Sequence, residues 1–243
     1  MARKTLLVTG ASSGIGAATA VMAAEDHDLA LHYNSNAAGA DETAAAARAK
    51  GARVTIHRAD LSDPSSVPAL FASIDQEHGH LDKLVNNAGV VDQAQPVTAF
   101  TPARVMRMVS INLSSPILVA GEAARRMSSG GAIVNVSSAA ARFGSPGQYA
   151  DYAATKGGLE VFSKGLAQEL APQGIRVTAI RPGIIATPIH GKGGDAERVD
   201  RLAPSIPMRR AGSAEEVARA ILWLLSDQAS YVTDTVLDVS GGR

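Results

Sequence analysis

The chain of 243 residues contains no cysteine, which excludes disulfide scaffolds, thiolate zinc sites and cysteine nucleophiles. The lack of disulfides also suits a reducing compartment. Aromatic residues are scarce as well, with four Phe, four Tyr and one Trp. Because few side chains can stack on a large planar ligand, we expect a small or polar substrate.

Neither sign of charge is in excess, because 23 Lys and Arg balance 23 Asp and Glu. The sequence therefore lacks the basic field that holds nucleic acid or an anionic membrane surface. No apolar run approaches the roughly 18 residues of a membrane-spanning helix, and the first residues lead into a short apolar strand, not a signal-peptide core. We expect a cytoplasmic protein that binds small molecules and neither nucleic acid nor a membrane.

Hydrophobic residues make up 46% of the chain, and no low-complexity stretch or charge block interrupts it as a linker would. This length and composition are sufficient to bury one sizeable core. We therefore expect residues 1–243 to form a single domain. A segment at about 188–208, rich in glycine and charge, is typical of a mobile loop over a substrate pocket.

Short β-rich runs alternate with Ala/Leu/Glu-rich stretches of helical apolar spacing along the whole chain. Each right-handed crossover between parallel strands needs a helix to cover the sheet. The pattern predicts an α/β fold: a Rossmann-type, doubly wound parallel sheet of seven strands with helices on both faces. The predicted strands are Thr5–Thr9, Leu29–Tyr33, Arg53–His57, Lys83–Val85, Ala132–Val136, Ile175–Ile180 and Thr235–Val239.

A glycine-rich turn, Thr-Gly-Ala-Ser-Ser-Gly-Ile-Gly over residues 9–16, follows the first predicted strand and opens an Ala-rich helix. Glycines let the backbone approach phosphate oxygens, and the unpaired amides and positive end of the helix attract the anion. The glycine spacing differs from the commoner dinucleotide fingerprint. The candidate pyrophosphate-binding residues are Gly10, Ser12, Ser13, Gly14, Ile15 and Gly16.

Two other interpretations of this turn are open. It can be an ordinary glycine-rich turn between strand and helix. It also matches the Gly-x-Ser-x-Gly elbow of α/β hydrolases, which would make Ser12 a nucleophile. The hydrolase interpretation fails on chain order, because an elbow needs an oxyanion-hole loop from an earlier strand and only nine residues precede Gly10.

The end of the second predicted strand bears on the choice of dinucleotide. An acidic residue about 20 positions after the glycines would bind the adenosine ribose of NAD, but Asn34 stands there. A neutral side chain does not repel a 2′-phosphate, although Ser13 and Ser35 occupy positions where a cation would attract one. The residues mildly favour NADP, with NAD as the alternative.

Tyr152 and Lys156 are four residues apart in a predicted helix, so both project from the same face. A tyrosine titrates near pH 10, so acid–base catalysis at neutral pH needs a shift of about three units, or about 4 kcal/mol. One ammonium about 4 Å away supplies about that much at an effective dielectric of 20. Alone, a Tyr and a Lys at this spacing usually belong to a solvent-exposed helix face without a function. Here the fourth and fifth predicted strands end in Asn86–Gly89 and Ser137-Ser138, at the edge where α/β sheets bind ligands.

With these motifs in order, the chain resembles the short-chain dehydrogenase/reductase family over essentially its whole length. It is similar to 3-oxoacyl-[acyl-carrier-protein] reductases and to glucose and other sugar dehydrogenases. The resemblance implies a homotetramer or homodimer formed chiefly through helices near 114–128 and 149–171. The matched motifs are Thr9-Gly-x-x-x-Gly-x-Gly, Asp60-Leu61, Asn86-Asn87-Ala88-Gly89, Asn112, Ser138, Tyr152-x-x-x-Lys156, and Arg181-Pro182-Gly183 through Thr187.

The resemblance also implies roles for these positions. Tyr152 would exchange a proton with the substrate oxygen, Ser138 would hydrogen-bond that oxygen, and Asn112 would support a water leading protons outward. Lys156 would hold the nicotinamide ribose and lower the Tyr152 pKa. Asp60 would contact the adenine amine, Leu61 the adenine ring and Asn87 the adenosine-side ribose. The remaining implied cofactor contacts are Ala88, Gly89, Pro182, Gly183, Ile185 and Thr187, together with Tyr152 and Lys156.

Two positions depart from the family pattern. The family serine usually lies thirteen residues before the tyrosine, whereas Ser138 lies fourteen before it, which we interpret as a one-residue insertion in Arg142–Tyr149. We choose Ser138 over Ser137 because strand alternation points Ser137 to the opposite face. Asp234 stands where family members often carry glycine.

Several other side chains leave alternatives open. His78 and His80 suggest a metal pair, but we expect a solvated turn and no metal site, because no carboxylate or cysteine cluster accompanies them. His190 either reaches the substrate or is an exposed loop residue, and Tyr149 and Phe143 either line the pocket or pack under the loop.

The leading hypothesis is an NADP-preferring oxidoreductase that interconverts a carbonyl and a secondary alcohol, with Tyr152 as the general acid–base. One alternative is an NAD-dependent alcohol or sugar dehydrogenase of the same family. The other is a non-catalytic, dinucleotide-binding regulator on the same scaffold.

Overall fold

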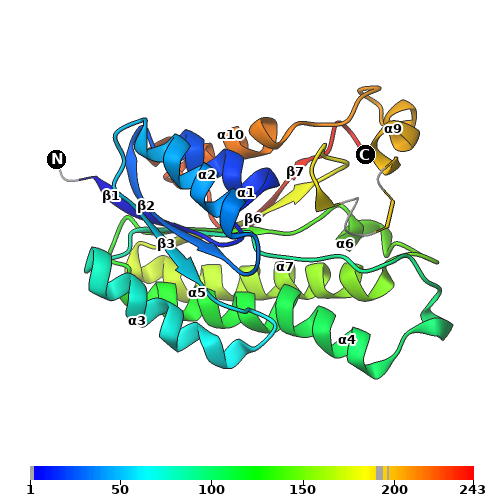
Figure 1. The fold of residues 1–243 in the computed structure, drawn as a ribbon, viewed down its shortest axis with the longest axis horizontal. Helices are drawn as coiled ribbons and strands as arrows, with labels where there is room; N and C mark the ends of the chain where they lie inside the picture. The colour runs from blue at the N-terminus through cyan, green and yellow to red at the C-terminus, as the bar shows by residue number, and fades with distance from the viewer. Residues whose placement is uncertain (1–2, 190–193, 196) are drawn as a thin grey trace.

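A computed structural model describes residues 3–189, 194–195 and 197–243. It contains one seven-stranded sheet in the order β3-β2-β1-β4-β5-β6-β7, and all neighbouring strands are parallel (Figure 1). The predicted α/β fold with a doubly wound parallel sheet is confirmed. The strands are β1 Lys4–Val8, β2 His27–Tyr33, β3 Val54–Arg58, β4 Lys83–Asn86, β5 Ala132–Val136, β6 Arg176–Pro182 and β7 Thr235–Val239.

The helices cover both faces of the sheet. In Figure 1, α1, α2 and α10 lie above it, and α3, α4, α5 and α7 lie below it. The helices are α1 Gly14–Ala23, α2 Ala37–Arg48, α3 Val67–His78, α4 Pro102–Val109, α5 Ser115–Arg126, α6 Ala140–Phe143, α7 Ala150–Leu170, α9 Arg198–Leu202 and α10 Ala214–Leu225. A π-helical turn, η3 Ser110–Ser114, joins α4 to α5, and short 3-10 turns occur at η1 Pro64–Ser66, η2 Val97–Ala99, η4 Ala171–Gln173, η5 Ala203–Ser205 and η6 Asp227–Ala229.

Two apolar layers hold the helices to the sheet, because successive strand residues point to opposite faces. In β1, Leu6 and Val8 pack into the layer under α1, α2 and α10, while Leu7 packs into the layer under α3, α5 and α7. All three side chains are fully buried. A central parallel strand buried on both faces explains the uninterrupted apolar run in the sequence.

The helix ends are set by local side chains. Asp63 accepts a hydrogen bond from the Ser65 amide (2.9 Å), and Thr101 accepts one from the Arg104 amide (3.2 Å), so both the Asp-Pro and the Thr-Pro pair cap helical turns. Gly174 ends the turn after α7 with a positive φ of 74°. Asp234 also has a positive φ, 52°, a backbone conformation that glycine adopts more readily than other residues.

The topology brings the motifs to one edge of the sheet. The strand order reverses between β1 and β4, and in open α/β sheets such a switch point, at the carboxyl ends of the strands, is where ligands bind. The segments after β1, β2, β4, β5 and β6 all lie at this edge because the strands are parallel. Among the described residues, the helices are all too short or too polar to cross a bilayer.

Candidate functional site

Two adjoining cavities lie at the carboxyl edge of the sheet. One, about 370 Å³, is lined by the glycine turn and the end of β2, and we call it the nucleotide cavity. The other, about 340 Å³, holds Ser138, Tyr152 and Lys156, and we call it the reaction cavity. Both are lined by Ile15, Asn87, Gly89, Val91, Thr187 and Ile189. The two cavities therefore form one continuous cleft.

The glycine turn is packed too tightly for any side chain at its centre. A Cβ on Gly16 would lie 2.3 Å from the Gly10 carbonyl oxygen, and one on Gly10 would lie 2.9 Å from the Ala88 Cα. Ser13 is the N-cap of α1, but its side chain makes no capping hydrogen bond. The first amides of α1 therefore face the nucleotide cavity without a side-chain acceptor, which is the arrangement that binds a phosphate.

The segment after β4 holds the glycine turn in place. Thr9 Oγ1 accepts hydrogen bonds from the amides of Asn87 and Ala88, each at 2.9 Å. The Asn87 side-chain amide donates to the Thr9 and Gly10 carbonyl oxygens at 2.8 and 3.2 Å. Asn87 lines both cavities, so its side chain braces the turn as well as standing where the ribose contact was predicted.

His32, near the end of β2, supports the turn from the other side. Its Nδ1 accepts the Gly10 amide hydrogen bond at 3.2 Å, so Nε2 carries the proton and donates to the Ala59 carbonyl oxygen at 3.1 Å. The side chain is 2% exposed, and burial lowers the His32 pKa to about 4. Only the neutral imidazole can accept from Gly10.

This arrangement makes folding stability sensitive to acid. The unfolded chain takes up a proton on His32 near its ordinary pKa of about 6.5, whereas the folded chain does so only near 4. The unfolded state thus binds more protons between these values, and stability falls as the pH drops through this window, by up to about 3 kcal/mol. We expect His32→Gln to have a shallower dependence of unfolding free energy on pH from 6.5 to 4.5, measured by urea titration. Identical slopes in the variant and the wild type would contradict this assignment.

The end of β2 presents a neutral side chain next to a fixed charge. The Asn34 side-chain amide donates to Asp60 Oδ1 at 3.1 Å, and Asp60 also accepts from the Ser62 amide at 2.9 Å. These hydrogen bonds lower the Asp60 pKa, the backbone amide of Ser62 contributing most. The Arg58 Nε donates to the Asn34 carbonyl oxygen at 3.2 Å, which brings a guanidinium to the end of the strand.

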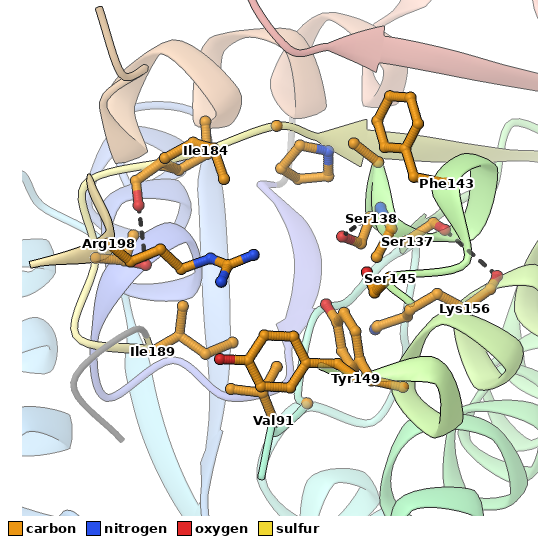
Figure 2. Close-up of a pocket in the computed structure, with 18 of the residues that line it drawn as sticks. Val91, Ser137, Ser138, Phe143, Ser145, Tyr149, Lys156, Ile184, Ile189 and Arg198 are labelled. Atoms are coloured by element: carbon orange, nitrogen blue, oxygen red, sulfur yellow. Dashed lines mark hydrogen bonds between the residues drawn. The ribbon is translucent and has the colours of Figure 1, made fainter. Parts of the chain in front are cut away.

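The reaction cavity gathers side chains from several elements. Ser138 follows β5, and Tyr152 and Lys156 project from α7 on successive turns. The Lys156 Nζ lies 5.7 Å from the centroid of the Tyr152 ring and donates to the Val136 carbonyl oxygen at 2.8 Å. Figure 2 shows Ser138, Tyr149, Lys156 and Arg198 around the same cavity.

The electrostatics of Tyr152 differ from the sequence-based expectation. Burial raises the Tyr152 pKa, and the hydrogen bond with Ser138 partly opposes this by lowering it. Burial also lowers the Lys156 pKa to about 8. A lysine that loses its proton before the tyrosine ionises supplies no charge at that pH, so in the protein alone Lys156 does not produce the predicted lowering.

Asn112 lies in the π-helical turn between α4 and α5, behind the cleft. It is fully buried, and its side chain accepts from the Val90 amide at 2.9 Å and donates to the Val90 carbonyl oxygen at 3.0 Å. In an α-helix, the amide of residue 116 would donate to the Asn112 carbonyl oxygen. Pro116 has no N–H and cannot make this hydrogen bond. The hydrogen bonding shifts to π spacing, and the Ser115 amide donates to the Ser110 carbonyl oxygen. The four-residue spacing of Asn112 and Pro116 is a sequence signal that could have predicted this turn.

Ser137 and Ser138 both line the reaction cavity, but their hydroxyls have different partners. The Ser137 hydroxyl donates to Glu160 Oε1 at 2.6 Å, and Glu160 also pairs with Arg181 at 2.6 Å. The Ser138 hydroxyl instead hydrogen-bonds Tyr152 and lines the reaction cavity.

Most of the predicted site residues line the cleft, and three do not. Gly16 packs against Gly10, Asp60 lies beside Asn34, and Asn112 lies behind Gly89. Phe143 and Tyr149 line the reaction cavity, as one of the two interpretations of these residues predicted. Sequence reasoning missed several residues of the site. Those that line the cleft are His32, Asn36, Arg107, Arg198, Arg201 and Arg243, and Arg58 bonds Asn34 beside it.

The interpretation of the histidine pair needs one correction. His78 is buried at the end of α3, where Nε2 bonds Thr55 Oγ1 at 2.8 Å, so the expected solvated turn is wrong for this residue. The reason is that β3 runs beside the helix end and Thr55 offers a partner. Within the described ranges, no three His, Asp or Glu side chains gather as a metal-binding group. His190 lies outside the described residues.

Comparisons with known proteins agree with this geometry. A family model described as Enoyl-(Acyl carrier protein) reductase matches residues 10–243. The uncharacterized oxidoreductase YgfF of Escherichia coli K12 is 47% identical over 243 residues, 98% of each chain. A cis-4-hydroxycyclohexanecarboxylate dehydrogenase of Sinomonas cyclohexanicum is 40% identical and covers 99% of this chain and 96% of its own. A short-chain dehydrogenase of Burkholderia cenocepacia, solved with NADP, superimposes with a TM-score of 0.92 at 32% identity, over 98% of this chain and 97% of the other.

Proposed function

The chain belongs to the short-chain dehydrogenase/reductase family of oxidoreductases that act on alcohols and carbonyls, and on that premise we propose that it reduces a ketone with NADPH, Tyr152 being the proton donor. The observation that carries the proposal is the continuous cleft. It joins a phosphate-binding turn at one end to Ser138, Tyr152 and Lys156 at the other. A non-catalytic regulator would need only the first of these.

The residues of the nucleotide cavity fit a dinucleotide. The turn is packed too closely to admit a side chain at Gly16, where a Cβ would lie 2.3 Å from the Gly10 carbonyl oxygen, and the uncapped start of α1 supplies amide donors. Leu61 and Ile111 add apolar surface to the lining of this cavity, which suits an adenine. Thr187 and Ile185 stand where the cleft enters the reaction cavity. When bound, NADP(H) supplies or accepts the hydride.

The side chains of the reaction cavity manage the proton. In reduction, Tyr152 donates its hydroxyl proton to the carbonyl oxygen as the carbon accepts the hydride, and in oxidation it takes a proton from the alcohol. Ser138 hydrogen-bonds the same oxygen and holds it within reach of the phenol. The raised pKa of Tyr152 keeps the phenol protonated at neutral pH, which suits the reducing direction. Lys156 lies against the phenol ring, and while protonated it offers an ammonium for the nicotinamide ribose.

The preference for NADP over NAD rests on the end of β2. Asn34 is neutral, and the Arg58 guanidinium, bonded to the Asn34 carbonyl, adds a positive charge beside the place where a 2′-phosphate would lie. The solved relative with bound NADP supports the same preference. The sequence alone offered only the neutral side chain, because Arg58 comes from the neighbouring strand.

We expect Asn34→Asp to weaken NADPH binding by about 10-fold while NADH binding changes less. The new carboxylate would lie about 3.1 Å from Asp60 Oδ1 and would repel both that carboxylate and a 2′-phosphate. Fluorescence titration with each cofactor measures the effect. Asn34→Ala is the matched control, since it removes the hydrogen bond without adding charge. Unchanged NADPH affinity in the Asp variant would mean that the phosphate binds elsewhere.

The proposal is tested by titrating the purified protein with NADPH and NADH and then following cofactor consumption with a panel of ketones. The panel contains cyclohexanone, 4-oxocyclohexanecarboxylate and a β-ketoacyl ester. Cofactor binding with turnover of at least one ketone supports the proposal. Binding without turnover of any carbonyl or alcohol favours the regulator, and no binding of either cofactor refutes the assignment.

We further propose that residues 1–243 act as one nucleotide-binding domain with a substrate segment at about 188–208, and that two or four copies associate through α5 and α7. Leu118 on α5 and Val161 on α7 are 45% and 73% exposed, which supports an apolar contact there. Light scattering of the purified protein distinguishes a monomer from a dimer or tetramer.

A further inference from the structure

The reaction cavity is strongly cationic although the chain as a whole is neutral. Lys156, Arg198, Arg201 and Arg243 line it, and none of its described lining residues is Asp or Glu. Lys156 is explained by the proposed chemistry. The three arginines are not, because proton transfer to a ketone needs no further cation.

Arg243 has an unsatisfied donor. Its Nη1 is buried and has no hydrogen-bond partner, and its guanidinium lies 5.9 Å from the Phe143 ring. Arg142 is a useful comparison, since it lies 5.8 Å from the same ring but pairs with Asp238 at 3.1 Å and does not line the reaction cavity. A buried guanidinium donor without an acceptor is unfavourable unless a ligand supplies one.

Arg198 offers a second cation in the lining of the same cavity, and Figure 2 shows its guanidinium directed into that cavity. Nη1 donates to Gln148 Oε1 at 2.8 Å, and the guanidinium lies 5.2 Å from the Tyr149 ring. Its nearest carboxylate, Asp195, is 3.9 Å away and pairs more closely with Arg201. Asp195 therefore neutralises mainly Arg201, and Arg198 has only the longer ion pair with it.

We propose that Arg243 and Arg198 form a subsite for a carboxylate on the substrate, so that the physiological substrate is a small keto acid or the corresponding hydroxy acid. The inference rests on the proposed function and adds the substrate class. The anion is not a cofactor phosphate, because the glycine turn lines the nucleotide cavity and these two arginines do not. A bound anion would give the buried, unpartnered Arg243 Nη1 an acceptor, and a planar carboxylate matches the fork of a guanidinium.

The test compares one keto acid with its neutral ester. We expect the wild type to reduce 4-oxocyclohexanecarboxylate with a kcat/KM at least about 30-fold above that of its methyl ester. Arg243→Gln should lower kcat/KM for the acid by about 30-fold, mainly through KM, and change the value for the ester by less than about twofold. Arg142→Gln is the matched control and should leave both values near those of the wild type.

The outcomes separate the subsite from the reaction. Equal loss for acid and ester in the Arg243 variant would show a structural role and overturn the subsite, as would a wild type that prefers the ester or reduces neutral ketones but not the acid. In those cases the proposed function stands. If no carbonyl compound is reduced with either cofactor, the proposed function fails and the subsite fails with it.

Discussion

Replacing Tyr152 with Phe should reduce kcat for ketone reduction by about 10³-fold and leave the dissociation constant for NADPH within about twofold of the wild type. The substitution removes only the hydroxyl that donates the proton, and positioned general acids contribute roughly 10²–10⁴-fold. The ring that lies 5.7 Å from the Lys156 Nζ is retained, so the ammonium should keep its place. Cofactor consumption and fluorescence titration on the same preparation measure both quantities.

Tyr231→Phe is the matched control, because Tyr231 is fully exposed and lines neither cavity of the cleft. It should leave kcat unchanged. A Tyr152→Phe variant that retained more than about a tenth of the wild-type kcat would show that another group or water delivers the proton. Loss of NADPH binding together with turnover would instead indicate that the phenol supports the cavity rather than the chemistry.

Gly16→Ala has the second large expected effect, a loss of NADPH affinity of at least about 100-fold, or about 2.7 kcal/mol. The added Cβ would lie 2.3 Å from the Gly10 carbonyl oxygen and 2.6 Å from the Asn87 side-chain Nδ2, whereas Cβ atoms essentially never approach other heavy atoms within 3.0 Å. The glycine turn or the start of α1 must move to relieve the clash. Either displacement misplaces the amides that face the nucleotide cavity.

Gly165→Ala provides the control for this substitution. Gly165 lies within α7, and a Cβ there would meet nothing within 4 Å. Since alanine is a better helix former, we expect equal or slightly higher stability, by up to about 1 kcal/mol, and unchanged NADPH binding. The two variants are compared by fluorescence titration and by thermal unfolding. If Gly16→Ala bound NADPH as tightly as Gly165→Ala, the turn would not be the phosphate cradle.

The fold was predictable because alternating strands and helices leave a periodic signal within short windows. All seven strands were found, with ends that differ from the structure by at most two residues. The differences arise where pairing with a neighbour decides the end: His27 and Asp28 are drawn into β2 by pairing with Lys4 and Thr5 of β1. Propensity within one segment contains no information about such a partner.

The site was predictable where its residues form a local motif and not where distant segments supply contacts. The glycine turn and the Tyr152–Lys156 spacing are local. His32 acquires its role only because Gly10, 22 residues earlier, donates to it. Arg243 reaches the reaction cavity from the far end of the chain, and Arg198 does so from α9. Burial also overrode a local prediction, since Lys156 was expected to lower the Tyr152 pKa and in the protein alone does not.

The bond between Thr9 and the Asn87 amide joins residues 78 positions apart in the chain. Closing so long a loop is entropically unfavourable unless β1 and β4 pair across it, so the support of the glycine turn depends on long-range strand pairing. A chain that has not completed this pairing has no phosphate site and cannot bind the dinucleotide. A dinucleotide that binds only the finished cleft would therefore add to the stability of the folded state by mass action.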